Sequence, residues 1–130
     1  MQPISPAAVF GLNLFLTSSS VADGKVWLSD NHGRQVIRID PATYAIDGTV
    51  PLPHRVWSVT AGGGSIWASQ LEDADGVATG YGVVRIDPET LAAATAEVPI
   101  FSVSWGADAL WGLGYGRRGD LLYRIEPDAG

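Results

Sequence analysis

Two histidines and a small group of charged residues are the side chains of this chain that could perform acid–base or electrostatic chemistry. Histidine is readily poised for proton transfer near neutral pH, and a neighbouring carboxylate can orient the ring or hold a divalent cation. The candidate residues are His32, Arg34, His54, Arg55, Glu72, Asp73, Asp75, Arg117 and Arg118. They lie in four separate polar segments, so any shared site depends on the elements that bring those segments together.

Several common catalytic and metal-binding patterns are missing from the sequence. There is no cysteine, which excludes a disulfide, a cysteine–zinc site and a thiol nucleophile. The segment 72–76 lacks the alternating acids and the distal glutamate of a calcium loop. The glycine-rich stretches 62–64 and 80–82 precede predicted strands and not helix starts, so they indicate turns and not a phosphate-binding loop. We therefore predict no metal site and no cofactor from these residues.

Charge and hydropathy narrow the range of partners. The net charge is -6, and Arg117-Arg118 is the only cluster of basic residues, which argues against nucleic acid. The apolar stretch 7–16 lacks a positive n-region and is interrupted by Gly11 and Asn13, so it favours a strand over a signal peptide. No apolar run has the length needed to cross a bilayer, and we expect no membrane partner. The compartment, cytoplasmic or extracytoplasmic, stays open.

The sequence contains three copies of one pattern, and this repeat predicts the fold. Trp27, Trp67 and Trp111 are 40 and 44 residues apart, the period of a four-stranded propeller blade (about 40–50 residues). Each tryptophan is followed by an Arg-Ile pair and then by an acidic residue and a proline. These residues are Arg38-Ile39-Asp40-Pro41, Arg85-Ile86-Asp87-Pro88 and Arg124-Ile125-Glu126-Pro127.

Each repeat reads as short β-rich runs separated by turn residues. The predicted first strands are 15–22, 56–61 and 101–105; the second strands are 26–29, 66–69 and 110–113; the third strands are 36–40, 83–87 and 121–126. Fourth strands are predicted at 46–52 and 91–100, in the first two units only. The fold class is therefore all-β, a β-propeller segment of about three four-stranded blades.

The predicted organisation is a single segment over residues 1–130. It divides into a spare N-terminal strand in 1–14, with its apolar run at 7–12, and blades at 15–53, 54–100 and 101–130, the last without its fourth strand. An N-terminal strand that pairs with the three C-terminal strands would close a ring and remove its exposed edges.

The repeated residues resemble those of the YVTN / virginiamycin B lyase-like β-propellers, a broad bacterial class. The resemblance lies in Trp27-Leu28-Ser29 with 36–43, and in Trp67-Ala68-Ser69 with 83–90; the third copy departs from it with Gly112-Leu113. It implies propellers of six or seven blades, whereas this chain has three. Either further blades of a longer chain or a second copy, as a homodimer forming a six-bladed ring, would complete the partial ring.

The repeated tryptophans and arginines are best explained as blade scaffolding, so residues that differ between units are the candidates for function. In a propeller, the loops between second and third strands and the loops between blades open on one rim. Here these loops are 30–34, 70–80 and 114–120, with 53–55 and 100–102, and they would gather the nine candidate residues.

Two functions follow from this placement. The favoured one is a binding or scaffold segment that recognises a small molecule or a protein through the rim. The alternative, implied by the resemblance, is a lyase- or lactonase-type enzyme in which His32 or His54, with Glu72 and a divalent cation, opens a ring by elimination.

Overall fold

The computed structural model describes residues 3–9, 11–74, 76–116 and 119–127. Within these ranges the regular structure consists of eleven β-strands, and no described segment is a helix. The search for an apolar helix long enough to cross a membrane accordingly finds none among the described residues.

The strands form three antiparallel sheets, one for each sequence repeat. The first sheet contains β1 (Leu16–Ala22), β2 (Lys25–Asp30), β3 (Gln35–Ile39) and β4 (Ile46–Pro51). The second contains β5 (Arg55–Gly62), β6 (Ser65–Ala74), β7 (Val77–Ile86) and β8 (Ala93–Ala96). The third contains β9 (Ile100–Gly106), β10 (Ala109–Gly116) and β11 (Gly119–Ile125). All eleven strands overlap predicted runs, although β6, β7 and β10 extend into segments predicted as loops, and the third sheet has three strands as expected.

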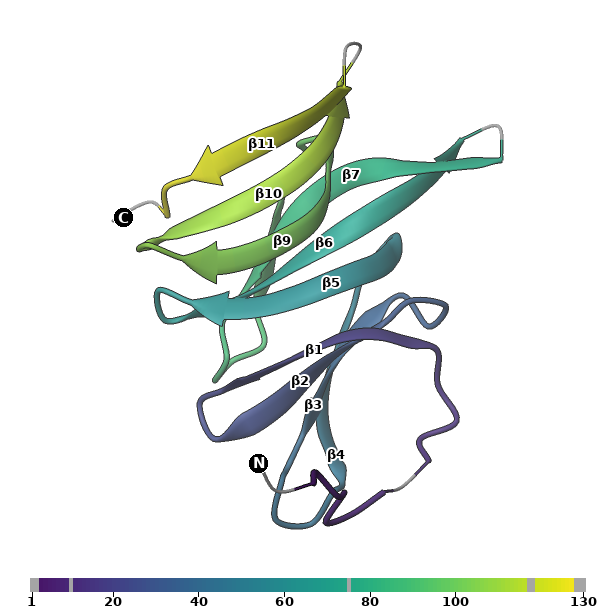
Figure 1. Ribbon diagram of the computed structural model, residues 1–130, viewed down its shortest axis with the longest axis vertical. Helices are drawn as coiled ribbons and strands as arrows, with labels where there is room; N and C mark the ends of the chain where they lie inside the picture. Colours follow the sequence, from purple (N-terminus) through teal and green to yellow (C-terminus); the bar gives the residue numbers. More distant parts are fainter. Residues whose placement is uncertain (1–2, 10, 75, 117–118, 128–130) are drawn as a thin grey trace.

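The sheets lie one upon the next along the long axis of the molecule (Figure 1). The first strands of successive sheets are neighbours, β1 against β5 and β5 against β9. In each sheet the first strand lies at one edge and the later strands follow it in chain order, as in the blades of a propeller.

Tryptophans fill the wedges between neighbouring sheets, as the repeat predicts. Trp27 is fully buried with Val36 and Val50 of the first sheet against Val59 and Val84 of the second. Trp67 does the same between the second and third sheets, where its ring lies 6.2 Å from that of Trp105. Large flat rings bury much apolar area in such a wedge, and this burial holds the sheets together.

The arginine of each repeat lies over the tryptophan of its own sheet. Arg38, Arg85 and Arg124 are the direct cross-strand partners of Trp27, Trp67 and Trp111, so the two side chains share one face. The guanidinium carbons lie 5.8, 5.1 and 5.7 Å from the ring centroids, within the range of a cation–π contact.

The serine two residues after the tryptophan joins neighbouring sheets by hydrogen bonds. Ser69 is fully buried and donates to the carbonyl oxygen of Phe101 in the third sheet at 2.9 Å. Likewise, Oγ of Ser29 donates to the carbonyl oxygen of Trp57 in the second sheet at 3.4 Å. The Trp-x-Ser motif is therefore an interface motif.

The predictions for the N-terminal run and for two of the loops are wrong. The run 7–12 is not a strand among its described residues, and the N-terminal segment lies at the end of the stack away from the third sheet, so it does not pair with β11 (Figure 1). With three sheets the stack does not return on itself, and the two ends cannot meet within one chain. The insertion 70–80 is not a loop but the extension of β6 and β7 into a long hairpin. Glu72 and Asp73 pair with Thr79 and Ala78 across the two strands. The predicted loop 114–120 is likewise a hairpin, in which β10 and β11 pair as far as Gly116 and Gly119.

Candidate functional site

The first strand of each sheet carries a β-bulge at the same place. The bulged residue is left unpaired, which interrupts the alternation of side chains between the two faces of the sheet. The irregularities lie at Thr17 in β1, Trp57 in β5 and Phe101 in β9. Bulges are common next to functional sites because they re-aim a side chain. The bulged residues differ between sheets: Thr17 donates to the carbonyl oxygen of Trp57 at 2.6 Å, while the indole of Trp57 is 43% exposed.

The exposed indole forms one wall of a shallow apolar pocket. This aromatic pocket has a volume of about 210 Å³ and is lined by Trp57, Leu71, Ala78, Phe101 and Tyr115. The rings of Phe101 and Tyr115 are stacked, with centroids 4.6 Å apart, and Tyr115 is 61% exposed. Such a pocket holds about one apolar side chain or ring, because sites for drug-sized ligands are larger (about 300–1,000 Å³).

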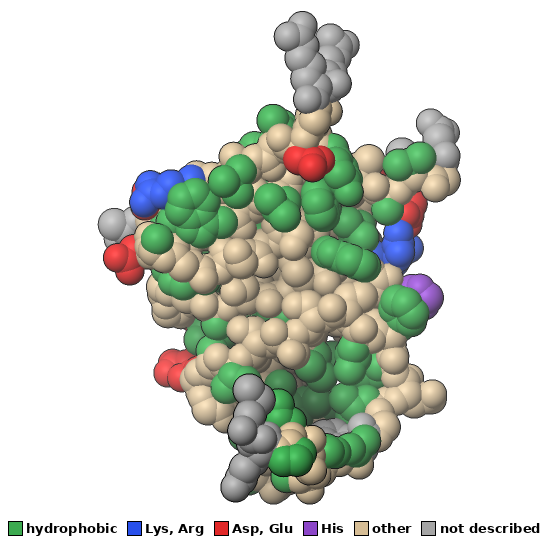
Figure 2. Space-filling model, in the orientation of Figure 1, with side chains coloured by type: hydrophobic (Ala, Val, Ile, Leu, Met, Phe, Trp, Pro, Cys, Tyr) green, Lys and Arg blue, Asp and Glu red, His purple; other side chains and the backbone are tan. Residues whose placement is uncertain are grey.

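A charged pocket adjoins it and shares Leu71. It has a volume of about 200 Å³, and its lining residues are Arg34, His54, Arg55, Leu71, Glu72 and Asp73. The guanidinium of Arg55 binds the carboxylate of Asp73 through two nitrogens, with the Nε–Oδ2 distance at 2.9 Å. Figure 2 shows an acidic and a basic side chain side by side at one edge of the molecule.

Buried amide side chains position the charged pocket. Asn31, at the end of β2 and 1% exposed, accepts a hydrogen bond from Nη1 of Arg55 and donates to the carbonyl oxygen of Val56 at 3.0 Å. The fully buried Gln70 accepts a hydrogen bond from the backbone nitrogen of His54 at 3.2 Å. The pocket is therefore held by groups from both the first and the second sheet.

The two histidines have different surroundings. His54 stacks obliquely on Tyr81, with centroids 3.8 Å apart, and the Tyr81 hydroxyl donates to Glu97 at 2.9 Å. That hydrogen bond raises the pKa of Tyr81, because it favours the neutral phenol beside a carboxylate. His32 lies instead against Phe15, just before β1, with nearly parallel rings 4.3 Å apart, and does not line the charged pocket.

The structure thus places five of the nine candidate residues in one pocket: Arg34, His54, Arg55, Glu72 and Asp73. His32 is separate, and Asp75, Arg117 and Arg118 lie outside the described residues. No cluster of three or more His, Asp or Glu side chains suited to a metal ion is found among the described residues.

The sequence interpretation missed the aromatic half of the site. Trp57, Phe101 and Tyr115 lie outside the repeated motif, and Trp57 and Phe101 occupy one equivalent position at which the first sheet has Thr17. A position that varies between units while its neighbours repeat is the signal that could have identified them.

Comparison with solved structures identifies the architecture. The chain superposes on Saccharomyces cerevisiae Sqt1 with a TM-score of 0.60 and 10% identity, over 86% of this chain and 32% of that one. It superposes on U3-55K with a TM-score of 0.61 and 10% identity, over 92% of this chain and 42% of that one. Both are WD40 β-propeller proteins.

The fold is that of a β-propeller. The chain spans less than half the length of either structure, so it corresponds to part of a propeller of that kind. No family model matches the sequence, and no curated protein matches it. The expected likeness to the YVTN / virginiamycin B lyase-like group therefore stays a prediction, while the blade architecture is confirmed.

Proposed function

We propose that this propeller segment is a protein-binding module, and that its binding site is the aromatic pocket together with the charged pocket. The observation that carries the proposal is the exposure of Trp57 and Tyr115 next to the arginine pair Arg34 and Arg55. Tryptophan, tyrosine and arginine are the residues most enriched at the energetic centres of protein interfaces. A binding or scaffold role also agrees with the propeller architecture of the two structural neighbours.

The geometry indicates the kind of segment that would bind. The aromatic pocket has room for one apolar side chain, and the adjoining charged pocket offers groups of both signs. A peptide with an apolar or aromatic anchor and a charged residue next to it would satisfy both pockets. The site is open and shallow, which suits a segment lying across it and not a molecule enclosed within it.

Selection from a random displayed-peptide library tests this function. The selected peptides should contain an apolar anchor, and their affinity should fall at least about tenfold in Trp57→Ala, because truncation of a central interface tryptophan costs about 2 kcal/mol or more. Thr49→Ala, an exposed change on β4 outside both pockets, is the matched control and should bind normally. Selection of no peptide, or equal binding to Trp57→Ala, would count against a peptide-binding site.

A second candidate is the lyase- or lactonase-type enzyme with a divalent cation. The observation that favours it is the presence of His54 and Glu72 in one pocket, where the imidazole could act as a base and the carboxylate could help hold the ion. Mg²⁺, Ca²⁺ or Mn²⁺ should then raise the melting temperature of the chain, and Glu72→Gln should abolish that rise. A melting temperature that none of the three ions raises would count against the enzyme, and protein binding would remain as the proposed function.

A further inference from the structure

The arginine of each repeat has a carboxylate partner in two of the three sheets. In the first sheet, Nε of Arg38 donates to Oδ1 of Asp47 at 2.7 Å. In the third sheet, Arg124 forms an ion pair with Glu126. None of the ion pairs among the described residues involves Arg85 of the second sheet, although its guanidinium is charged like the other two.

The fourth strand of the second sheet lacks the residue that supplies the acid in the first sheet. In β4 the register shifts between the partners of Arg38 and Ile39, which leaves Asp47 as an extra, bulged residue. β8 pairs with β7 without such a shift, and Ala94 is the direct partner of Arg85. No residue of β8 therefore corresponds to Asp47.

A positive charge is missing from the second sheet as well. In the first sheet, Nζ of Lys25 lies 2.6 Å from Oδ2 of Asp47 and 3.7 Å from Oδ2 of Asp40. The residue two positions before the repeated tryptophan is Lys25 in the first repeat and Ser65 in the second. The first sheet thus fills this place with a lysine–aspartate pair, and the second sheet has neither charge.

The place of the missing pair is a hollow on the second sheet with a volume of about 430 Å³. Arg85 and Asp87, the counterparts of Arg38 and Asp40, line it together with Ser65, and its other lining residues are glycine or alanine. All of these residues belong to the second repeat. The small side chains leave room for a ligand between the two charged groups.

The two charged groups of the hollow are held in place by other contacts. Arg85 lies over the tryptophan ring of its own sheet, and its Nε donates to Ser65 at 2.8 Å, while neither Nη atom donates to a described residue. The backbone nitrogens of Thr90 and Glu89 both donate to Oδ1 of Asp87 and hold the pKa of this carboxyl below its usual value. Near neutral pH the hollow therefore presents one positive and one negative group.

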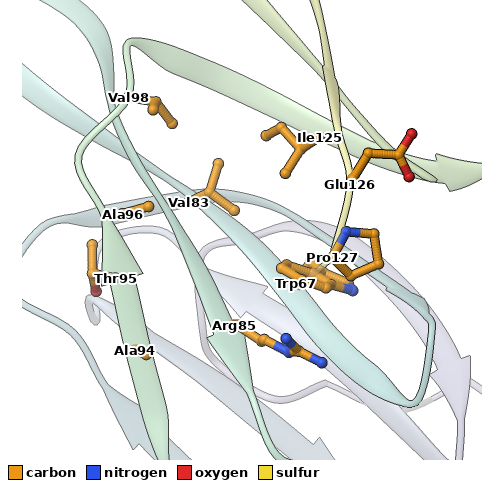
Figure 3. Close-up of a pocket in the computed structure, with 10 residues that line it drawn as sticks. All are labelled: Trp67, Val83, Arg85, Ala94, Thr95, Ala96, Val98, Ile125, Glu126 and Pro127. Atoms are coloured by element: carbon orange, nitrogen blue, oxygen red, sulfur yellow. The ribbon is translucent and has the colours of Figure 1, made fainter. Parts of the chain in front are cut away.

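Arg85 also lines a second pocket, of about 320 Å³, between the second sheet and the end of β11 (Figure 3). The acid in the lining of that pocket, Glu126, is the one bound to Arg124. Of the two cavities, the hollow is the one that combines a positive and a negative group without an ion pair between them.

We propose that the hollow binds a small zwitterion, an α-amino acid, through Arg85 and Asp87. The carboxylate of the ligand takes the place of the Asp47 carboxylate and accepts hydrogen bonds from the Nη atoms of Arg85. Its ammonium group takes the place of the Lys25 ammonium and faces Asp87. An α-amino acid carries its two charged groups on one carbon atom, which suits the close contact of the lysine and aspartate groups that it replaces.

This site goes beyond protein binding by the aromatic and charged pockets, with which the hollow shares no lining residue. The hollow is open and lined by small residues, so the side chain of the amino acid would point to solvent. We therefore expect the site to recognise the two charged groups and to discriminate little between amino acids that differ in their side chains.

Titration of free glycine into the isotope-labelled protein, followed by NMR at low ionic strength, tests the proposal. Glycine should shift the amide signals of Ser65 and Ala94 in a saturable manner. Acetate and methylamine, which each carry one of the two charges, should bind at least about tenfold more weakly, because each leaves one charge-assisted hydrogen bond unmade. Equal binding of glycine and acetate would overturn the assignment of a zwitterion.

Two variants test the residues. Arg85→Met keeps the apolar stem of the side chain but removes its charge, and should weaken glycine binding at least about tenfold. The same change in the third sheet, Arg124→Met, is the matched control and should bind glycine as the wild type does.

Ala94→Asp restores an acid directly across from Arg85 and should abolish glycine binding while raising the melting temperature. Thr49→Asp adds the same charge at an exposed position of β4 and should leave binding unchanged. The absence of a saturable shift in the wild type would overturn the proposal, as would glycine binding that survives in a folded Ala94→Asp protein.

Discussion

Arg55 donates a hydrogen bond from Nη1 to Oδ1 of Asn31 at 3.2 Å, which ties the charged pocket of the second sheet to a buried side chain of the first. The same arginine binds the carboxylate of Asp73 on the hairpin. One guanidinium therefore connects two sheets and the long hairpin. The geometry of the candidate site consequently depends on how the first two blades are packed.

Replacement of Asn31 should destabilise the fold as well as the site. Asn31→Ala removes the donor to the carbonyl oxygen of the buried Val56 and the acceptor for the partly exposed Arg55, so two partners lose a hydrogen bond. We expect a loss of about 1–3 kcal/mol in the free energy of unfolding, measured by urea denaturation. The exposed change Thr49→Ala should stay within about 0.5 kcal/mol of the wild type. A loss for Asn31→Ala no larger than that of this control would contradict the assignment.

Two glycines at equivalent positions should respond differently to alanine. A Cβ on Gly62 would meet the ring of Trp105 at 2.0 Å, whereas a Cβ on Gly106 would meet nothing within 4 Å. Gly62→Ala should therefore force the second and third sheets apart and cost about 1–3 kcal/mol. Gly106→Ala should be close to neutral in the same denaturation measurement, and equal effects of the two changes would refute the packing described.

The serine bridge between the second and third sheets should contribute measurably. The buried Ser69 binds Ser58 Oγ at 2.6 Å and the carbonyl oxygen of the half-buried Phe101 at 2.9 Å. Ser69→Ala leaves these groups without that hydroxyl and should cost about 1–3 kcal/mol in the free energy of unfolding. The exposed Ser104→Ala, on β9, supplies the control and should change little.

Acid should weaken the turn that follows β7. The backbone N–H groups of Thr90 and Glu89 bind the Asp87 carboxylate and hold its pKa below the ordinary value of 3.8. Since the folded-state pKa is the lower one, this carboxylate stabilises the fold above the ordinary pKa and stops doing so as the pH falls through the folded pKa. The stability difference between the wild type and Asp87→Ala should therefore shrink between about pH 6 and pH 2. A constant difference over that range would show that the carboxylate charge is not involved.

The blade architecture could be predicted because its determinants repeat in the sequence. Trp27, Trp67 and Trp111 mark the same position in three sheets, and the alternation around them gives the strands. The long hairpin was missed because the Gly and Asp residues of this segment resemble loop composition, whereas its strands are defined by pairing between Leu71–Ala74 and 77–80. The prediction of a strand at 7–12 was wrong because this apolar run would have to pair with the third sheet, which lies at the other end of the molecule.

The candidate site could be predicted only in part, for a related reason. Loop position alone brings Arg34, His54 and Arg55 to one rim, and the structure places them in one pocket. The aromatic pocket depends on bulges at Trp57 and Phe101, and bulges arise from strand pairing and not from local composition. His32 shows the limit of the same argument, since it lies on the rim but stacks on Phe15.

Hydroxyl-radical footprinting of the five tryptophans, read by mass spectrometry, tests the stacked-blade account most directly. Trp27 and Trp67 are 0% and 5% exposed in the wedges between sheets, whereas Trp57 is 43% exposed at the site. We expect Trp57 to be oxidised fastest and Trp27 and Trp67 slowest. Oxidation of Trp27 or Trp67 as fast as that of Trp57 would show that the sheets do not pack through these rings.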